Sequence, residues 1–234
     1  MRIRCADFVV GAASASGIAV VIDVFRACSL IAHALAAGAT RVIPLEDADE
    51  ALALKAAHPD WWLAGERHAK PLPGFDCGNS PTQILALPLA GRTLLHTTHA
   101  GTQGLAAAGR SAEVVLSGAL VNAAATVDYI HWLAPSEVTI VAMGHEARES
   151  CVEDDLCRDL LVARLRGEPF DTAALPARLR AAPAALKFFD PAAHWAPEQD
   201  FALCSAVDTL PVVAQLRRRP GALPALELAS RSRT

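Results

Sequence analysis

Acidic and basic side chains stand at the ends of the apolar runs of this sequence. The run Ile18–Val24 reaches Asp23 near its end, and Arg26 follows close behind. Carboxylate oxygens are hard ligands that suit Mg²⁺, and an arginine can grip an oxyanion with two N–H groups. A metal ion with arginines that spread the charge of a phosphoryl group is the recurrent solution for phosphoryl transfer. This pattern therefore predicts phosphoryl chemistry.

Further charged residues follow later apolar runs in the same way. The candidate metal ligands are Asp23, Glu66, Glu153 and Asp154, and the candidate anion clamps are Arg26, Arg67 and Arg148. Glu146 and His145 are both candidates for the general base, and the sequence does not decide between them. The competing interpretation is structural, because acids stabilise the first turn of a helix and polar residues are common in turns.

The segment 97–102 combines hydroxyls, a glycine and an expected helix start. Backbone N–H groups and a helix N-terminus form a natural phosphate cradle. The candidate phosphate-binding residues are Thr97, Thr98, Gly101, Thr102 and, from a separate turn, Asn79. We expect His99 to lie close enough to modulate the bound anion. The alternative is that the segment is only a strand–helix turn, with His99 pointing to solvent.

Several familiar catalytic motifs are missing from the sequence. There is no GxxxxGK[ST], GxGxxG or GxSxG string, which disfavours a P-loop, a dinucleotide site and a serine hydrolase elbow. Asp23 lacks the second aspartate and the threonine of a DxDxT phosphatase loop. Cys151 is followed by an arginine one residue too late for a Cys-x5-Arg loop. We therefore expect attack by water, without a covalent intermediate.

Strand and helix patterns alternate along the chain and would position these residues. Expected strands are Ile18–Val24, Arg41–Leu45, Trp61–Ala64, Arg92–Thr97, Glu113–Ser117, Val138–Met143 and Leu210–Leu216. Expected helices are Ala27–Ala37, the segment from Asp47 to before Pro59, Thr102–Ala108, Val121–Leu133, Val152–Leu165 and Glu198–Val207. This alternation predicts one three-layer α/β/α domain over residues 1–234 with a largely parallel, or mixed, sheet. Ligands of such sheets bind beyond the carboxyl ends of the strands.

Composition limits the remaining possibilities. The net charge is -4 without a basic stripe, which disfavours nucleic acid as a partner, and no apolar run reaches membrane-spanning length. Asp7 interrupts the apolar N-terminal stretch, which argues against a signal peptide. Six scattered cysteines indicate reduced thiols and a cytoplasmic protein. The scarcity of lysine against arginine indicates a GC-rich bacterial genome.

The proline-rich segment 167–200 shows little periodicity. We expect short helices and loops that form a lid, a small subdomain or a contact in a homo-oligomer. The tail after Arg217 is expected to be frayed.

Short segments between Ile18 and Gln215 together resemble one known family. They are Val20–Ala27, Gly65–Arg67, Gly74–Pro81, Thr97-Thr98, Gly101-Thr102, Ser117-Gly118 with Asn122, Gly144 with Glu146 and Arg148, Glu153-Asp154, and Asp200, Cys204, Asp208 and Pro211. The family is that of the 2-phosphosulfolactate phosphatases. The resemblance implies a Mg²⁺-dependent phosphatase that removes phosphate from 2-phospho-3-sulfolactate, a step of coenzyme M biosynthesis in methanogens. Many bacterial members occur without that pathway.

The chain also departs from the pattern of this family near the expected pocket. Cys28-Ser29 stands where two threonines are common, and His99-Ala100 replaces a Thr-Asn pair. The spacing from Arg148 to Glu153 is one residue longer. The alternatives are a non-catalytic anion-binding homologue, or a hydrolase or transferase of another sulfonated or carboxylated metabolite.

Overall fold

The apolar run that begins at Ile18 forms strand β2 (Ile18–Ile22), and every residue of β2 is buried. Burial on both faces explains why this run is apolar throughout. In the computed structural model, which describes residues 1–231, β2 pairs in parallel with β7 (Val114–Gly118) and β8 (Glu137–Ala142). The edge strand β1 (Arg2–Asp7) pairs in parallel with β8. These strands form one parallel block.

A second parallel block contains β3 (Arg41–Leu45), β6 (Thr93–Thr97) and β4 (Trp62–Arg67), and the short β5 (Lys70–Pro71) extends it in the antiparallel sense. An antiparallel hairpin of β9 (Ala214–Arg217) and β10 (Ala225–Leu228) joins the two blocks. Within the described residues the sheet has ten strands in the order β1-β8-β2-β7-β9-β10-β3-β6-β4-β5. The predicted α/β class with a mostly parallel, mixed sheet is confirmed.

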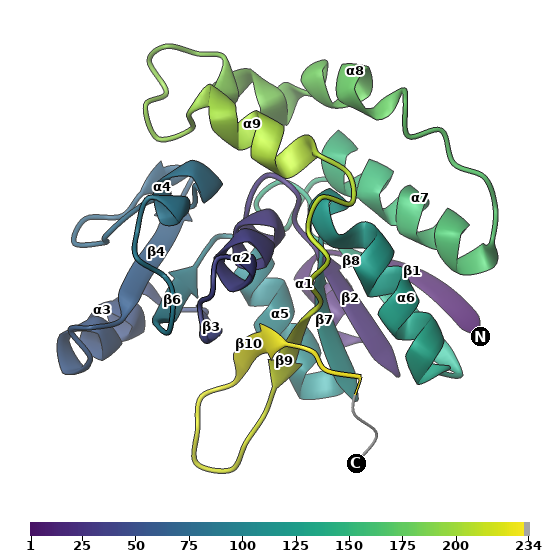
Figure 1. The fold of residues 1–234 in the computed structure, drawn as a ribbon, viewed down its shortest axis with the longest axis horizontal. Coiled ribbons are helices and arrows are strands. Elements are labelled where there is room, and N and C mark those ends of the chain that lie inside the picture. Colours follow the sequence, from purple (N-terminus) through teal and green to yellow (C-terminus); the bar gives the residue numbers. More distant parts are fainter. Residues whose placement is uncertain (232–234) are drawn as a thin grey trace.

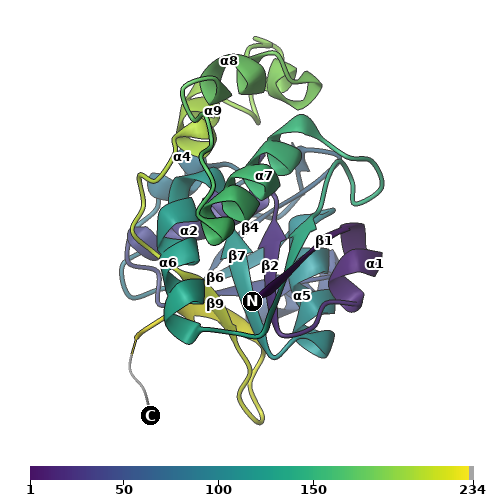
Figure 2. The ribbon, with the colours of Figure 1, turned by 90° about the vertical axis from the view of Figure 1, so that its right-hand side faces the viewer.

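Helices cover both faces of this sheet (Figures 1 and 2). They are α1 (Phe8–Ala13), α2 (Ala27–Ala36), α3 (Ala48–Ala57), α4 (Pro81–Leu85), α5 (Gly101–Ser111), α6 (Ala123–Leu133) and α7 (Val152–Arg166). Alternate residues of β2 face different cores. Val21 packs with residues of α1, α2 and α5, whereas Val20 and Ile22 pack with residues of α6 and α7. This alternation gives the three expected layers.

The predicted start of α3 is confirmed in detail. The side chain of Asp47 accepts a hydrogen bond from the N–H of Glu50 at 2.8 Å, as an N-cap should. The chain after Arg217 was expected to be frayed, and this expectation is wrong for Ala225–Leu228. These residues form β10, which belongs to the sheet. The rest of this prediction, residues 232–234, lies outside the described residues. The strand expected from Leu210 begins only at Ala214, since Leu210 donates its N–H to the carbonyl of Val121 instead.

The segment 167–200 crosses the top of the molecule in Figure 1. It contains α8 (Leu175–Arg180) and the 3-10 helix η2 (Pro183–Phe188), and it leads into α9 (Glu198–Ser205). Phe188 packs edge-on against Phe25, which follows β2, with ring centroids 5.1 Å apart. The segment therefore lies over the carboxyl end of β2, and its role as a lid stays a prediction.

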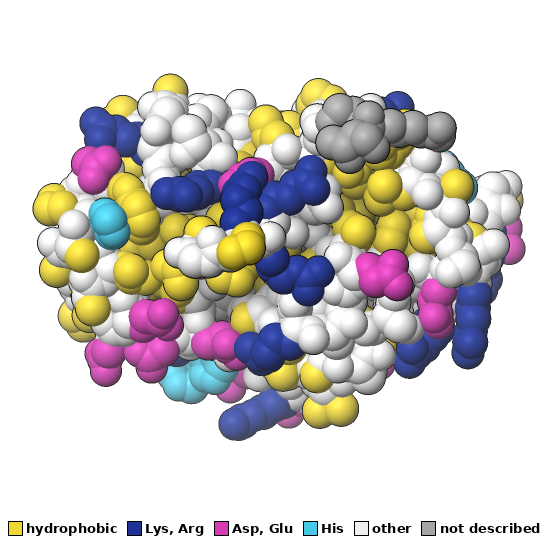
Figure 3. All heavy atoms as spheres, turned by 90° about the horizontal axis from the view of Figure 1, so that it is seen from below, with side chains coloured by type: hydrophobic (Ala, Val, Ile, Leu, Met, Phe, Trp, Pro, Cys, Tyr) yellow, Lys and Arg dark blue, Asp and Glu magenta, His cyan; other side chains and the backbone are white. Residues whose placement is uncertain are grey.

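The opposite side of the molecule carries the loop between β9 and β10. Figure 3 shows this side from below, with Lys and Arg side chains gathered across its middle. Arg218, at the start of the loop, donates to the carbonyls of Ala112 and Glu113 at 3.1 and 2.8 Å, and Arg219 pairs with Glu227. Both arginines thus fix the loop to the body of the protein. Among the helices of residues 1–231, none is both long and apolar enough to span a bilayer.

Candidate active site

A cavity of about 250 Å³ opens beyond the carboxyl end of β2. Its wall comes from segments that are far apart in sequence: the ends of β2 and β4, the loops before α5 and after β8, the first turn of α7, and η2. The charged and histidine side chains that line it are Asp23, Arg26, Glu66, His68, His99, His145, Glu146, Glu153, Asp154 and Lys187. The structure thus brings together all four candidate metal ligands at the expected edge of the sheet. We call Asp23, Glu66, Glu153 and Asp154 the acidic floor.

Asp23 is buried at the end of β2, with 9% of its surface exposed. Its Oδ1 accepts a hydrogen bond from the N–H of Ala27 at 3.1 Å, which anchors the carboxylate at the start of α2. Burial raises the pKa of Asp23 to about 6, although the N–H of Ala27 lowers it, and repulsion from Glu66 and Glu153 adds to the rise. A carboxylate in such a place is unfavourable unless a cation joins it.

Asp154 and Glu153 lie in the first turn of α7 and differ in what they contact. Asp154 accepts from the N–H groups of Val24 and Gly144, both at 2.8 Å, and so joins the segments after β2 and β8. Burial, with repulsion from Asp23 and Glu153, raises its pKa well above the ordinary value. Glu153 is 3% exposed, and its Oε2 has no hydrogen-bond partner in the part of the chain that the structure describes. Asp154 therefore orients the backbone, whereas Glu153 offers a buried, unpaired oxygen.

Glu66 is the penultimate residue of β4 and holds two loops together. Its Oε2 accepts from the N–H of Ala69 and its Oε1 from the N–H of His99, both at 2.7 Å. The side chain is 7% exposed and lines the cavity. Each oxygen keeps a lone pair, so Glu66 can still act as a metal ligand.

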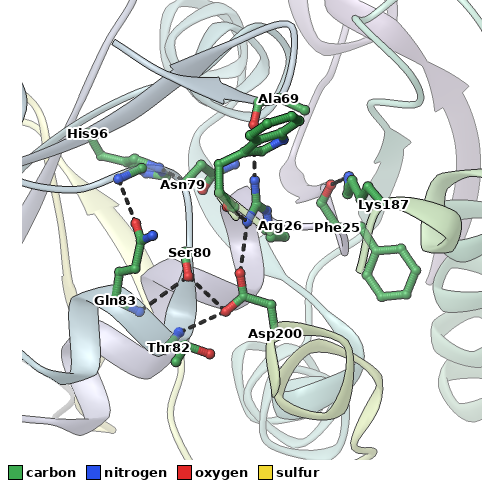
Figure 4. Close-up of polar contacts among 12 residues, drawn as sticks. Phe25, Arg26, Ala69, Asn79, Ser80, Thr82, Gln83, His96, Lys187 and Asp200 are labelled. Carbon is green, nitrogen blue, oxygen red and sulfur yellow. Dashed lines mark hydrogen bonds and ion pairs between the residues drawn. The ribbon is translucent and has the colours of Figure 1, made fainter. Parts of the chain in front are cut away.

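Arg26 lines the cavity but is held by the protein (Figure 4). Its Nη1 donates to the carboxylate of Asp200 and to the carbonyl of Trp195, both at 2.8 Å, and its Nη2 donates to the carbonyl of Ala69 at 3.3 Å. Asp200 also accepts from the hydroxyl of Ser80 at 2.9 Å. Because this ion pair is buried and multiply bonded, Arg26 supplies fixed positive charge, and its direct contact with a substrate stays a prediction.

Lys187 is the cationic lining residue that the sequence analysis missed. It comes from η2, and its Nζ donates to the carbonyl of Phe25 at 3.3 Å (Figure 4). Burial lowers its pKa, repulsion from Arg26 adds to this, and attraction to Glu153 and Asp23 opposes it. No motif surrounds this lysine in the irregular segment 167–200, so only its rarity in the chain could have singled it out.

Two predicted anion clamps are not brought to the cavity. Arg67 donates to the hydroxyl of Thr97 at 3.0 Å and to the carbonyls of Glu66 and Glu46 at 2.7 and 3.2 Å. It thus ties β4 to neighbouring segments of the sheet. Arg148 is exposed, and within residues 1–231 it lies outside the cavity lining.

The expected phosphate cradle is largely bonded to itself. The N–H of Thr98 donates to the hydroxyl of Thr102 at 2.9 Å, and the N–H of Thr102 donates to the hydroxyl of Thr98 at 3.1 Å. The hydroxyl of Thr97 accepts from Arg67. A Cβ on Gly101 would lie 2.7 Å from Asp23 Oδ2, so this glycine permits close packing against the acidic floor. In the described chain, only His99 and Ala100 of the segment 97–102 line the cavity.

Asn79 does line the cavity, as a residue of the turn before α4. Its Oδ1 lies 3.1 Å from Nε2 of His96. Burial lowers the pKa of His96 to about 3, so its ring is neutral and donates to the amide oxygen. This bond orients Asn79, whose predicted contact with phosphate stays a prediction.

At the mouth of the cavity lie His68, His99 and Glu146, which we call the rim. The Nδ1 of His68 is 2.6 Å from the carboxylate of Glu146. This hydrogen bond lowers the pKa of Glu146, and the nearby charges of His99 and His145 lower it further. Sequence analysis named Glu146 and His145 for acid–base work but missed His68, because its neighbours in the site are distant in sequence.

The thiol of Cys151 also reaches the cavity wall. Burial raises its pKa, and the charges of Asp154 and Glu153 add to the rise. A thiol held neutral is a poor nucleophile. This agrees with a site whose chemistry is carried by carboxylates.

Comparison with known proteins extends this picture. The family described as 2-phosphosulpholactate phosphatase matches residues 7–219 of the chain. A protein of Deinococcus radiodurans is 38% identical over 131 residues, which cover 56% of this chain and 55% of the relative. A protein of Gloeobacter violaceus is 40% identical over 163 residues, covering 69% and 68%. For Thermosynechococcus vestitus the identity is 37% over 164 residues, covering 67% and 65%.

Each of these relatives is named a probable 2-phosphosulfolactate phosphatase. The first of them is matched over little more than half of its length. The family match, in contrast, takes in both the acidic floor and Lys187. By this match, the chain belongs to the 2-phosphosulpholactate phosphatase family.

Proposed function

We propose that this protein is a Mg²⁺-dependent phosphatase that hydrolyses a small anionic phosphate ester such as 2-phospho-3-sulfolactate. The observation that carries the proposal is the buried, unpaired Oε2 of Glu153, set beside Asp23 and Glu66 in one cavity. Three oxygen ligands of this kind suit a small hard cation. The family to which the chain belongs supports the reaction class.

The excess of negative charge in the cavity supports the proposal that a cation binds there before an anionic substrate can bind. In the described chain, five carboxylates but only two lysine or arginine side chains line the cavity. An ester that carries phosphate and sulfonate or carboxylate groups would meet net repulsion there. Mg²⁺ bound by Asp23, Glu66 and Glu153 would offset this repulsion, and when bound it supplies stabilisation of the charge on the phosphoryl oxygens. Asp154 would position the loops through its two backbone hydrogen bonds.

Lys187 and Arg26 would attract the anionic groups of the ester. Arg26 is held rigidly by Asp200, so its charge is already in place when the substrate arrives. Lys187 is the more adaptable of the two, since its ammonium group has a single hydrogen bond to the carbonyl of Phe25 among the described residues. Glu146 and His145 remain the candidates for the base that takes a proton from water.

The six cysteines are free thiols, of which three are buried, two are half-buried and one is exposed. Among the described residues Cys151 is the one cysteine that lines the cavity. The reduced state of the six cysteines supports the proposal of a cytoplasmic enzyme. A homo-oligomer stays a prediction.

Phosphate release from a panel of esters tests the function. The panel contains 2-phospho-3-sulfolactate, carboxylated phosphate esters and p-nitrophenyl phosphate, each with Mg²⁺ and with EDTA. We expect hydrolysis of a sulfonated or carboxylated ester only with Mg²⁺. Calorimetric binding of such an ester without any release of phosphate would instead identify an anion-binding homologue. Turnover that survives EDTA treatment would refute the metal dependence.

A further inference from the structure

The rim brings together three metal-ligating side chains from three separate loops. His68 lies in the turn between β4 and β5, His99 in the loop before α5, and Glu146 in the loop after β8. One potential ligand atom of each residue lies within 4.8 Å of those of the other two. The rings of His68 and His99 meet edge to face, with centroids 4.8 Å apart. No floor residue belongs to this group of ligand atoms in the described chain.

The chemistry of this group differs from that of the acidic floor. Two imidazoles and one carboxylate are the protein ligands of many zinc sites, which leave a further position open to water or substrate. Mg²⁺, in contrast, prefers oxygen ligands alone. The side chain of His68 is 70% exposed and that of Glu146 is 24% exposed, so an ion can enter from solvent and keep water ligands.

His99 supplies a second observation. Its Nδ1 is shielded from solvent and has no hydrogen-bond partner among residues 1–231. No protein group of the described chain therefore competes with a ligand for this nitrogen. The backbone of His99 is nevertheless held, because its N–H donates to Glu66.

The backbone of the other two residues is also unusual. His68 has a φ of 53° and Glu146 has a φ of 49°. Both values lie in the left-handed region, which residues other than glycine rarely adopt. Both residues hold this conformation at the point where their side chains meet. Conformations of this kind concentrate at functional sites and ligand clamps.

We propose that His68, His99 and Glu146 bind one divalent transition metal ion of the Zn²⁺ type at the cavity rim. The site is separate from the buried acids and does not depend on the phosphatase proposal. The competing explanation is that His68 and Glu146 form only an ion pair at the surface, with His99 beside them.

Calorimetric titration with Zn²⁺ in the presence of millimolar Mg²⁺ tests the proposal, and Co²⁺ absorption reports the ligand set. We expect one site in the wild-type protein, with visible Co²⁺ bands of a nitrogen-containing site. His68→Asn, His99→Thr and Glu146→Gln should each weaken Zn²⁺ binding by at least about 10-fold, on the scale of changes around metal sites. Equal thermal unfolding midpoints would show that the variants stay folded.

Two controls locate the ion. His194→Asn removes an exposed histidine that lies away from the cavity lining of the described chain and should leave affinity unchanged. Glu153→Gln should also leave Zn²⁺ affinity unchanged while it removes the floor oxygen. The proposal fails if wild-type protein binds no Zn²⁺, if the three rim variants bind it as tightly as wild type, or if Glu153→Gln alone abolishes binding.

Discussion

The acidic floor and the rim of one cavity are built on different principles. Floor carboxylates are buried, and Asp23, Glu66 and Asp154 accept hydrogen bonds from backbone N–H groups that fix them. In the rim, His68 and Glu146 bond to each other and remain in contact with solvent. The backbone therefore fixes three of the floor carboxylates, whereas the rim is formed by side chains from three separate loops.

The electrostatic consequences also differ between the two regions. Burial raises the pKa of Asp23 and Asp154, so the floor without metal resists full ionisation. The hydrogen bond from His68 lowers the pKa of Glu146, so the rim carries its charge readily. A bound cation should therefore lower the pKa values of the floor carboxylates far more than the pKa of Glu146 in the rim.

The largest effect is expected from the unpaired floor oxygen. Glu153→Gln should lower Mg²⁺-dependent kcat/KM by at least about 100-fold, because it replaces a metal-binding carboxylate with a neutral amide. The matched control is Asp155→Asn, two residues along the same helix, which removes an acid paired with Arg158 at 2.7 Å. Steady-state phosphate release at several Mg²⁺ concentrations measures both. Similar losses in the two variants would mean that helix charge, and not ligation, matters here.

Asp23→Asn should stabilise the metal-free protein at neutral pH. A carboxylate with a pKa of about 6 when folded and 3.8 when unfolded loses roughly 3 kcal/mol of native stability as pH rises from about 4 to about 6. The sign follows because the folded chain binds more protons than the unfolded chain in this window, so stability is present below it and lost above it. The amide does not titrate and avoids that loss.

Urea unfolding at pH 4.5 and pH 7.5, with and without Mg²⁺, measures this difference. At pH 7.5 without metal the variant should exceed wild type in unfolding free energy, and the gap should shrink at pH 4.5. Mg²⁺ should stabilise wild type more than the variant. A gap that does not change with pH would show that Asp23 does not titrate in this range.

A smaller effect is expected from the removal of Lys187, the lysine that lines the cavity. Lys187→Met should raise KM by about 10-fold, the scale of one hydrogen bond to a charged group, with less change in kcat. Arg148→Gln, which removes an exposed cation outside the cavity lining of residues 1–231, should change KM by less than about twofold. Equal changes in both variants would point to general electrostatic attraction and remove Lys187 from the substrate site.

The smallest effect concerns the connection between rim and floor. His99→Thr should leave Mg²⁺ affinity within about twofold of wild type, since the bond to Glu66 uses the backbone N–H, which any residue other than proline provides. Its effect should instead appear in the pH profile or the substrate preference. Calorimetry with Mg²⁺ checks this, and a tenfold loss of affinity would show that the two regions act as one site.

Local sequence determined much of the acidic floor. The run Ile18–Ile22 is apolar because it is buried on both faces, and a chain that leaves the sheet there must place Asp23 at its edge. Glu153 and Asp154 lie in the first turn of α7 for an equally local reason, since a helix begins at Val152. Their place beside the end of β2, 130 positions away, comes from tertiary contacts. Strand ends and helix starts follow from patterns of a few residues, so these positions could be predicted.

Tertiary structure alone decided which of the other candidates reach the cavity. Arg26 meets Asp200 across 174 positions of sequence, Lys187 arrives on an irregular segment, and Thr98 and Thr102 bond to each other instead of to a ligand. Of the hairpin that joins the two parallel blocks, the expected strand Leu210–Leu216 overlaps β9, but β10 and the pairing with both blocks were not predicted, because they depend on partner strands far away in the chain. A local pattern fixes the type of side chain at a strand end, but its partners and its burial come from contacts between distant segments, which leave no periodic signal in the sequence.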